Sequence, residues 1–218
     1  MNDSNSNNPD GNVIFSGTKE VAENLKFNEA GLQEWFGDSI SSAGKILKIV
    51  QFKGGQSNPT YKITTEKQQF VLRRKPPGIL LPSAHAVDRE YKVMTALQQT
   101  EVPVPKTYGL CEDEDVIGTP FFVMDFLDGN IYWDLLLGDK SPAERSDIYA
   151  SKNNVIAQLH MVDYESVGLS DYGKPGNYIA RQVSRWTKQY IASETQDIPA
   201  MNNLIDWLPS NIPDEDET

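Results

Sequence analysis

The sequence changes character once, near residue 129, where strand-like segments give way to segments with helical periodicity. Five short segments are apolar and rich in β-branched or aromatic residues, which is typical of strands: residues 46–52, 60–65, 70–73, 107–112 and 119–126. Between the third and the fourth, residues 84–98 repeat apolar side chains at helical spacing. Beyond residue 129 only helical patterns recur. This order predicts an α+β fold with two lobes, in which a five-stranded antiparallel sheet with one inserted helix precedes a lobe of helices.

Capping residues and turns give further boundaries. Asn28 is the expected N-cap of a helix that runs through Phe36, and Ser141 with Glu144 forms the capping-box pattern of a helix that reaches about residue 161. Later helices are expected over residues 179–190 and 199–208, and an acidic hairpin turn at residues 113–115. We therefore expect a disordered tail over residues 1–12, a strand-rich lobe over residues 13–128 and a helical lobe over residues 129–218.

Composition limits the classes of protein that this chain can belong to. The formal net charge of −11 argues against binding of a nucleic-acid backbone, although such acidity commonly reflects only solubility. No run of eighteen apolar residues occurs, so no membrane span is expected. The single cysteine, Cys111, excludes an intrachain disulfide. His85 and His160 lack the spacing of zinc ligands, so no metal-ligating residue is assigned.

The N-terminus has the pattern of neither a signal peptide nor a transit peptide. A cytoplasmic location is therefore expected. A mitochondrial or peroxisomal location would need a signal that this chain does not contain.

A glycine-containing loop is the first candidate for a binding site. It consists of Gly54, Gly55, Gln56, Ser57 and Asn58 and connects two predicted antiparallel strands. A Walker loop is excluded, because its phosphate site needs the N-terminus of a following helix. A flexible loop between strands can instead close over a triphosphate and offer backbone N–H groups. The alternative is an ordinary hairpin turn.

Glu90 is the second candidate, because it falls in the middle of the apolar stripe of the helix over residues 84–98. A carboxylate there is desolvated unless a cation meets it. Arg73, at the end of the preceding strand, is the natural partner. A cation on the third strand paired with a glutamate of the next helix is the arrangement with which kinases hold nucleotide phosphates. The alternatives are a solvated edge or a pair with Arg74, Lys75 or Arg89.

Two further groups of residues are weaker candidates. Residues 121–127 form a strand that leaves the sheet toward Gly129, and such a crossing is either the adenine-binding hinge of a kinase or a plain edge strand. Arg181 and Arg185, with Lys188, lie on a basic helix face that is either solvated or bound to an anionic substrate. His160, near a helix end, is expected to cap or pack.

The order of these motifs resembles the aminoglycoside phosphotransferase and choline kinase-like family. More closely, it is similar to the kinase-like N-terminal domain fused to acyl-CoA dehydrogenases in family members ten and eleven. The matching stretches are QFKGGQSN (51–58), VLRRKPPGILLP (71–82), AHAVDREY (84–91), VPVP (102–105), VIGTP (116–120), LH (159–160) and RQVSRW (181–186). They cover residues from about 45 to 208.

The resemblance implies ATP-dependent phosphoryl transfer to the hydroxyl of a small molecule, such as a hydroxy acid or its CoA thioester. By position, the loop from Gly54 to Asn58 covers the phosphates, Arg73 contacts them and Glu90 holds Arg73. The adenine hinge is Asp125, Phe126 and Leu127. Arg181 and Arg185 stay weaker candidates for binding of the acceptor, on the basis of the residues alone. A fused or associated acyl-CoA dehydrogenase part is the expected protein partner.

The family's catalytic loop contains His-Gly-Asp, and this triplet does not occur in the sequence. We therefore expect a chain that ends before the catalytic loop, with no catalytic base and no ligand for Mg²⁺. No residue is assigned as catalytic. The alternative is a non-catalytic nucleotide-binding or protein-interaction module.

Overall fold

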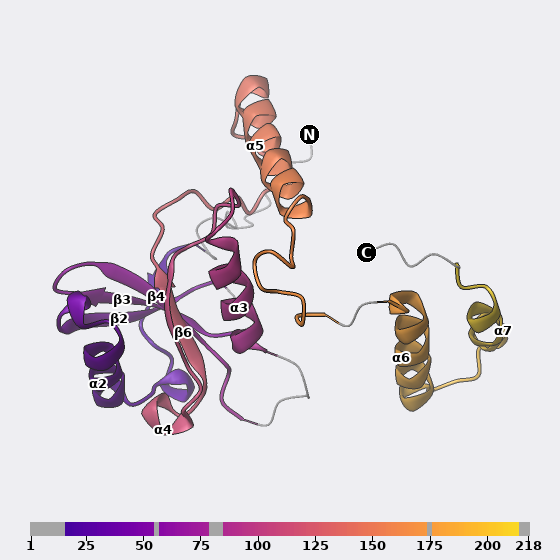
Figure 1. Ribbon diagram of the computed structural model, residues 1–218, viewed down its shortest axis with the longest axis horizontal. Helices are drawn as coiled ribbons and strands as arrows, with labels where there is room; N and C mark the ends of the chain where they lie inside the picture. Colours follow the sequence, from indigo (N-terminus) through magenta and orange to yellow (C-terminus); the bar gives the residue numbers. More distant parts are fainter. Residues whose placement is uncertain (1–15, 55–56, 79–84, 174–175, 214–218) are drawn as a thin grey trace, which may run out of the picture. The chain divides into compact units, whose positions relative to one another are not determined.

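The computed structural model describes residues 16–54, 57–78, 85–173 and 176–213. In this part of the chain, six antiparallel strands form one sheet in the order β1-β2-β3-β4-β6-β5 (Figure 1). The strands are β1 Thr18–Lys19, β2 Ile46–Phe52, β3 Thr60–Thr65, β4 Gln69–Arg74, β5 Thr107–Cys111 and β6 Phe121–Asp125. The predicted α+β class and the antiparallel sheet are confirmed, whereas the predicted number of five strands is too small.

The additional strand is β1, which pairs with the end of β2 in the register Thr18↔Phe52 and Lys19↔Gln51. Both of its residues are exposed. A strand of two exposed residues has neither the length nor the apolar alternation by which strands are recognised in a sequence. It places Gly17 beside the loop that follows β2, where the Lys53 N–H donates to the Gly17 carbonyl over 3.0 Å.

The helices are α2 Glu29–Ser39, α3 Val87–Leu97, α4 Glu114–Ile117, α5 Pro142–His160, α6 Tyr178–Ser193 and α7 Pro199–Trp207, with 3-10 turns at Glu23–Leu25, Ser41–Ala43 and Leu208–Ser210. The two helices with predicted capping residues, α2 and α5, begin where these residues place them. Asn28 caps α2 by accepting the Gly31 N–H, and the capping box of α5 is formed by Ser141 and Glu144 in both directions. These contacts satisfy backbone donors that have no partner inside the helix.

The connection between β5 and β6 differs from the prediction. A plain hairpin turn was expected at residues 113–115, but the chain forms the one-turn helix α4. The carboxylate of Asp113 accepts the Asp115 N–H over 2.9 Å and thereby starts the helix. Gly118, at φ 88°, ends it in the left-handed region that glycine adopts without steric cost.

The two faces of the sheet carry different residues because side chains alternate along each strand. On β4, Phe70 and Leu72 point into the hydrophobic core, where α2 and α4 cover them. The core consists of Leu32, Phe36, Ile40, Ala43, Tyr61, Ile63, Phe70, Leu72, Cys111, Ile117, Phe121 and Val123. Val71 and Arg73 point to the opposite face, where both line a cavity.

The face opposite the core is covered only in part, by α3. This helix packs against β5 and β6 (Figure 1). The ring of Tyr91 on α3 lies 6.0 Å from that of Phe122 on β6. Phe122 pairs with Arg73 across the two strands. This packing places Glu90, near the start of α3, next to Arg73. The cavity lies beside β2 and β3, which contribute Phe52 and Thr60 to its lining.

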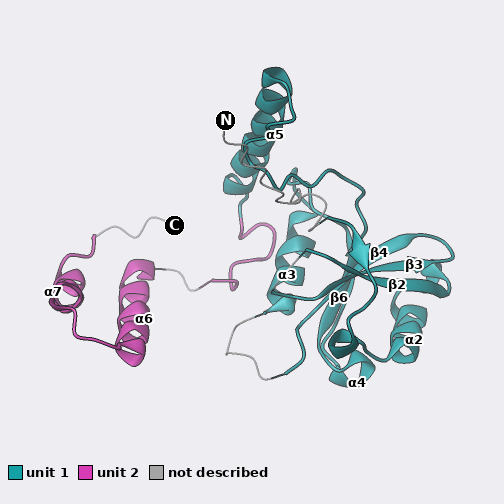
Figure 2. Ribbon diagram, turned by 180° about the vertical axis from the view of Figure 1, so that it is seen from behind, with its two compact units in different colours: residues 1–163 teal, residues 164–218 magenta. Residues whose placement is uncertain are grey.

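The chain divides into two compact units, Met1–Asp163 and Tyr164–Thr218 (Figure 2). The division lies beyond α5, which belongs to the first unit, whereas the sequence places a lobe boundary between residues 128 and 129. That lobe boundary stays a prediction, since compact units and catalytic lobes need not coincide. The tail expected over residues 1–12 lies outside the described residues.

The second unit consists mainly of α6 and α7, and their predicted apolar faces point toward one another. Together they line a cavity of about 340 Å³. The predicted inward residues that line it are Ile179, Val183, Trp186, Tyr190, Met201, Leu204, Ile205 and Leu208. Among the described residues, no helix combines the length and the apolar character that a bilayer crossing requires.

Candidate functional site

A cavity of about 330 Å³ opens on the face of the sheet opposite the core, within the first unit. Its volume lies at the lower end of the range for small-molecule sites, about 300–1,000 Å³. It is lined by Gly17, Phe52, Gly54, Thr60, Val71, Arg73, Ile131 and Trp133. Apolar and aromatic side chains thus meet one cation, Arg73. The cavity of the second unit has a similar volume, but no acidic or basic side chain lines it.

Arg73 and Glu90 form the predicted ion pair. The Nε of Arg73 donates to Glu90 Oε2 over 2.5 Å, and a terminal nitrogen donates to Oε1 over 3.2 Å. The other terminal nitrogen donates to Thr60 Oγ1 over 3.1 Å, so the guanidinium is fixed on two sides. The side chains are 26% and 32% exposed, which leaves the pair within reach of a ligand. The sequence left Arg74 open as the partner, but Arg74 is buried on the other face of β4.

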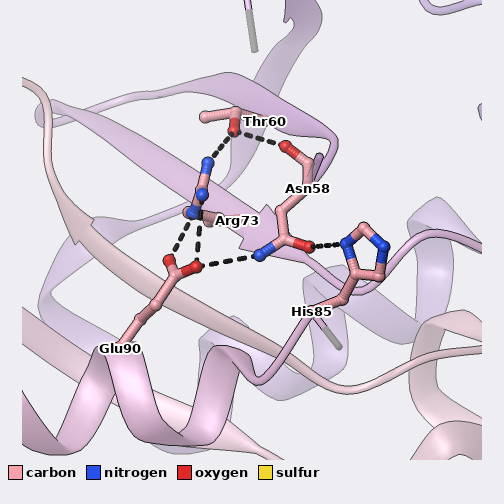
Figure 3. A network of polar contacts seen from close by, with 5 residues as sticks. All are labelled: Asn58, Thr60, Arg73, His85 and Glu90. Atoms are coloured by element: carbon pink, nitrogen blue, oxygen red, sulfur yellow. Dashed lines mark hydrogen bonds and ion pairs between the residues drawn. The ribbon is translucent and has the colours of Figure 1, made fainter. Parts of the chain in front are cut away.

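Two residues that the sequence did not connect with Glu90 extend this network (Figure 3). Asn58 Nδ2 donates to Glu90 Oε1 over 2.9 Å, and Asn58 Oδ1 lies 2.8 Å from His85 Nδ1. The hydroxyl of Thr60 donates to the Asn58 carbonyl over 3.0 Å. The network therefore joins the loop before β3, the strands β3 and β4, and the start of α3.

The glycine-containing loop reaches the cavity at one end. Gly54 lines the cavity and Ser57 is exposed, whereas Gly55 and Gln56 lie outside the described residues. Asn58 is only 2% exposed, and both ends of its side-chain amide have partners within the protein. Its side chain therefore supports Glu90, and a direct contact of this amide with phosphate would require the network to open.

The three residues predicted as a hinge have different environments. The backbone N–H of Asp125 donates to the Lys106 carbonyl, and its carboxylate accepts the hydroxyl of Tyr108 over 2.7 Å. Burial and this hydrogen bond raise the pKa of Tyr108 above its usual value. Phe126 stacks on Phe52, a residue of the cavity wall, and Leu127 is 63% exposed. The pairing of β6 with β4 ends at Asp125. Phe126 and Leu127 therefore remain the candidates for contact with a nucleobase.

One wall of the cavity was not expected from the sequence. It is made by Gly17, which precedes β1, and by Ile131 and Trp133 from the connection after β6. The indole Nε1 of Trp133 donates to the hydroxyl of Ser16 over 3.2 Å and so links this connection to the segment before β1. These residues are 117 positions apart. The run of apolar and aromatic residues around Trp133 was an available signal in the sequence.

Arg181 and Arg185, the candidates for acceptor binding, lie on α6 in the second unit. A terminal nitrogen of Arg181 donates to the carbonyl of Gly176, just before the helix. The cavity belongs to the first unit, so a role of these arginines in acceptor binding stays a prediction.

The described residues do not fit a protein-built metal site. They contain no group of three or more His, Cys, Asp or Glu side chains placed to hold a metal ion. Mg²⁺ that accompanies a nucleotide is bound through one or two carboxylates together with the phosphates. No residue described here is therefore assigned to it.

Comparisons with known proteins show the family of this chain. A family model described as "Phosphotransferase enzyme family" matches residues 48–218. Acyl-CoA dehydrogenase family member 11 of Homo sapiens is 45% identical over 208 residues, and family member 10 of Mus musculus is 49% identical over 172 residues. The "Crystal structure of a putative aminoglycoside phosphotransferase" from Ralstonia eutropha JMP134 is similar with a TM-score of 0.72 and 51% sequence identity, over 87% of this chain.

These relatives are longer than this chain. The match covers 92% of this chain but 27% of family member 11, and 79% of this chain but 16% of family member 10. It covers 55% of the chain in the crystal structure. This chain therefore spans about half of the similar crystal structure and about a quarter or less of the two curated relatives.

Proposed function

Because the chain belongs to the phosphotransferase enzyme family, we propose that the cavity of its first unit binds ATP, the donor of the phosphoryl group. The observation that carries this proposal is a fixed cation at the edge of a mostly apolar cavity. Phe52, Val71 and Trp133 offer apolar surface to a nucleobase, and Arg73 offers charge to phosphates. A nucleotide has this division into an aromatic and an anionic part.

The donors of Arg73 support a contact with phosphate. A guanidinium has five N–H donors. Within the part of the chain that the structure describes, three of them are used, two toward Glu90 and one toward Thr60, which leaves two for a ligand. Because Glu90 and Thr60 fix the plane of the guanidinium, little further ordering is needed when an anion binds.

The acceptor in this proposal is a hydroxyl of a small molecule, either a hydroxy acid or its CoA thioester. The similarity to proteins named acyl-CoA dehydrogenase favours an acyl substrate, and the same similarity favours a fused or associated dehydrogenase part. In the reaction the γ-phosphoryl group moves from ATP to the hydroxyl oxygen, ADP leaves, and the hydroxyl proton passes to a base. We assign no residue of this chain as that base.

The sequence supports a second function, since its 218 residues contain no His-Gly-Asp triplet. In this alternative the chain is a nucleotide-binding or interaction module without catalysis. Turnover separates the two functions: ADP formation is measured with the chain, ATP, Mg²⁺ and a panel of hydroxy acids and their CoA thioesters. Acceptor-dependent ADP formation supports the phosphotransferase and contradicts the module, and ATP binding without it supports the module.

The proposed binding of the adenine nucleobase in the cavity is tested with Trp133→Ala. Trp133 lines the cavity and is 42% exposed, so its truncation removes one aromatic wall without opening the core. We expect the affinity for ATP and for adenosine to fall about tenfold, the equivalent of one aromatic contact, in calorimetric titrations.

Trp207→Ala is the matched control, because Trp207 is 57% exposed and belongs to the second unit. It should leave both affinities at the native value. Equal losses of affinity in the two variants, or no loss of affinity in Trp133→Ala, would mean that the adenine nucleobase does not bind beside Trp133.

A further inference from the structure

We propose that Asn58 and His85 are positioning residues that hold the Glu90 carboxylate against Arg73. In this arrangement His85 is the neutral tautomer whose single ring N–H is at Nδ1. Neither residue lines the cavity, so both act through Glu90. The effect on phosphate binding rests on the proposed function, whereas the protonated nitrogen of His85 can be observed without any ligand.

The orientation of the Asn58 amide follows from its two neighbours. An ionised carboxylate only accepts hydrogen bonds, so the group that lies 2.9 Å from Glu90 Oε1 must be the NH₂ group of Asn58. The opposite orientation would bring the amide oxygen equally close to the carboxylate oxygen, and the two acceptors would repel each other. The carbonyl oxygen of Asn58 therefore faces His85.

The same reasoning fixes the proton on His85. An amide oxygen only accepts, and it lies 2.8 Å from His85 Nδ1, so Nδ1 must carry the hydrogen. In a neutral imidazole the proton is then absent from Nε2. The contacts run from His85 through Asn58 to Glu90 (Figure 3). Donation follows this direction.

The carboxylate of Glu90 needs this support on one side. Oε2 has a short contact with Arg73 Nε, but the contact between Oε1 and Arg73 is longer, at 3.2 Å against 2.5 Å. Asn58 provides the shorter of the two donors to Oε1. Without it the carboxylate can rotate, and Arg73 loses the partner that orients its guanidinium toward the cavity.

The backbone at His85 is also unusual. Its φ of 60° lies in the left-handed region, which among non-glycine residues is adopted most readily by Asn, Asp and His. The position thus combines a constrained backbone with a side chain that must donate at its δ position. Asn meets both requirements, because its Nδ2 occupies the place of His Nδ1. Asp meets the backbone requirement only, since its carboxylate accepts.

The first test is the proton itself. The chain has two histidines, His85 and His160, so its imidazole signals in a long-range ¹H–¹⁵N NMR spectrum can be assigned with a single variant, His160→Asn. At a pH where both rings are neutral, we expect a protonated Nδ1 and an unprotonated Nε2 for His85. A protonated Nε2 and a bare Nδ1 would overturn the proposed direction of donation.

The second test compares two nearly isosteric substitutions at His85. His85→Asn retains a donor and should bind ATP within about threefold of the native chain, whereas His85→Asp presents an acceptor and should bind at least about tenfold more weakly. Adenosine affinity should stay native in both. The same substitutions at His160, which is exposed at the end of α5, are the controls and should change neither affinity.

The outcomes separate this inference from the proposed function. Equal ATP affinity in His85→Asn and His85→Asp overturns the positioning role, and thermal unfolding of both variants shows that each is folded. If the native chain fails to bind ATP, the proposed function fails and the positioning role in phosphate binding fails with it. The NMR result then still decides whether the network donates from His85 through Asn58 to Glu90.

Discussion

At the scale of single residues, the properties of the site depend on the partial exposure of the ion pair between Arg73 and Glu90. The two side chains are 26% and 32% exposed, so water screens their attraction in part. A fully exposed pair contributes at most about 1 kcal/mol, whereas removal of one partner from a buried pair costs about 3–5 kcal/mol. The pair of this site lies between these limits, and its two additional hydrogen bonds, from Arg73 to Thr60 and from Asn58 to Glu90, bring it toward the buried case.

Glu90→Ala should therefore lower the free energy of unfolding by about 1–3 kcal/mol, because Arg73 and the buried amide of Asn58 both lose an acceptor. Urea unfolding followed by circular dichroism measures this change. Glu23→Ala is the control, since it makes the same change of net charge at an ion pair with Lys26 whose side chains are 87% and 58% exposed. It should leave the free energy of unfolding nearly unchanged, because water screens a fully exposed pair. Equal effects of the two substitutions would mean that Glu90 is energetically a surface residue.

At the scale of elements, the packing of α2 on the sheet depends on a close approach between Trp35 and β5. A Cβ atom added at Gly109 would lie 3.1 Å from two atoms of the Trp35 ring. This ring also packs edge-on against Phe121, with ring centroids 4.9 Å apart. At Gly109 a side chain on β5 would therefore collide with the Trp35 ring of α2.

A matched pair of Gly→Ala substitutions tests this packing. Gly109→Ala should destabilise the chain by about 1–3 kcal/mol, because the Trp35 ring must shift within a packed layer. Gly37→Ala, at an exposed position of α2 where an added Cβ would meet no atom within 4 Å, should stabilise it by about 0.5–1 kcal/mol. Thermal unfolding of both variants measures whether each substitution raises or lowers the stability. Stabilisation by both substitutions would show that α2 does not depend on this contact.

The elements also show what the sequence can and cannot predict. The bounds of β2 and β3 agree with their apolar patterns, and the pair of Glu90 with Arg73 was predictable because a carboxylate within an apolar stripe needs a cation. The contacts of Asn58 were not, since they join residues 32 and 27 positions apart through the geometry of a loop and a helix start. Sequence periodicity shows only which face of an element a residue occupies. With two residues, β1 is too short to show a periodic pattern.

At the scale of the whole molecule, the chain shares most of β2, the strands β3 to β6 and the helices from α3 onward with a family of phosphotransferases over residues 48–218. In the first unit, the core on one face of the sheet fixes the strands, and the opposite face carries the cavity with Arg73. The second unit contributes α6 and α7 with their own apolar cavity. We propose that the first unit alone binds the nucleotide.

The most direct test of this claim is a calorimetric titration of the native chain and of Arg73→Gln with ATP and with adenosine. We expect the native chain to bind ATP at least about tenfold more tightly than adenosine, because only ATP offers charge to the guanidinium. Arg73→Gln should lose this difference and retain the affinity for adenosine. Lys48→Gln removes the same charge at an exposed position of β2 that does not line the cavity, and it should behave as the native chain. An Arg73→Gln chain that still prefers ATP by the native factor, or a native chain that binds neither ligand, would contradict the account.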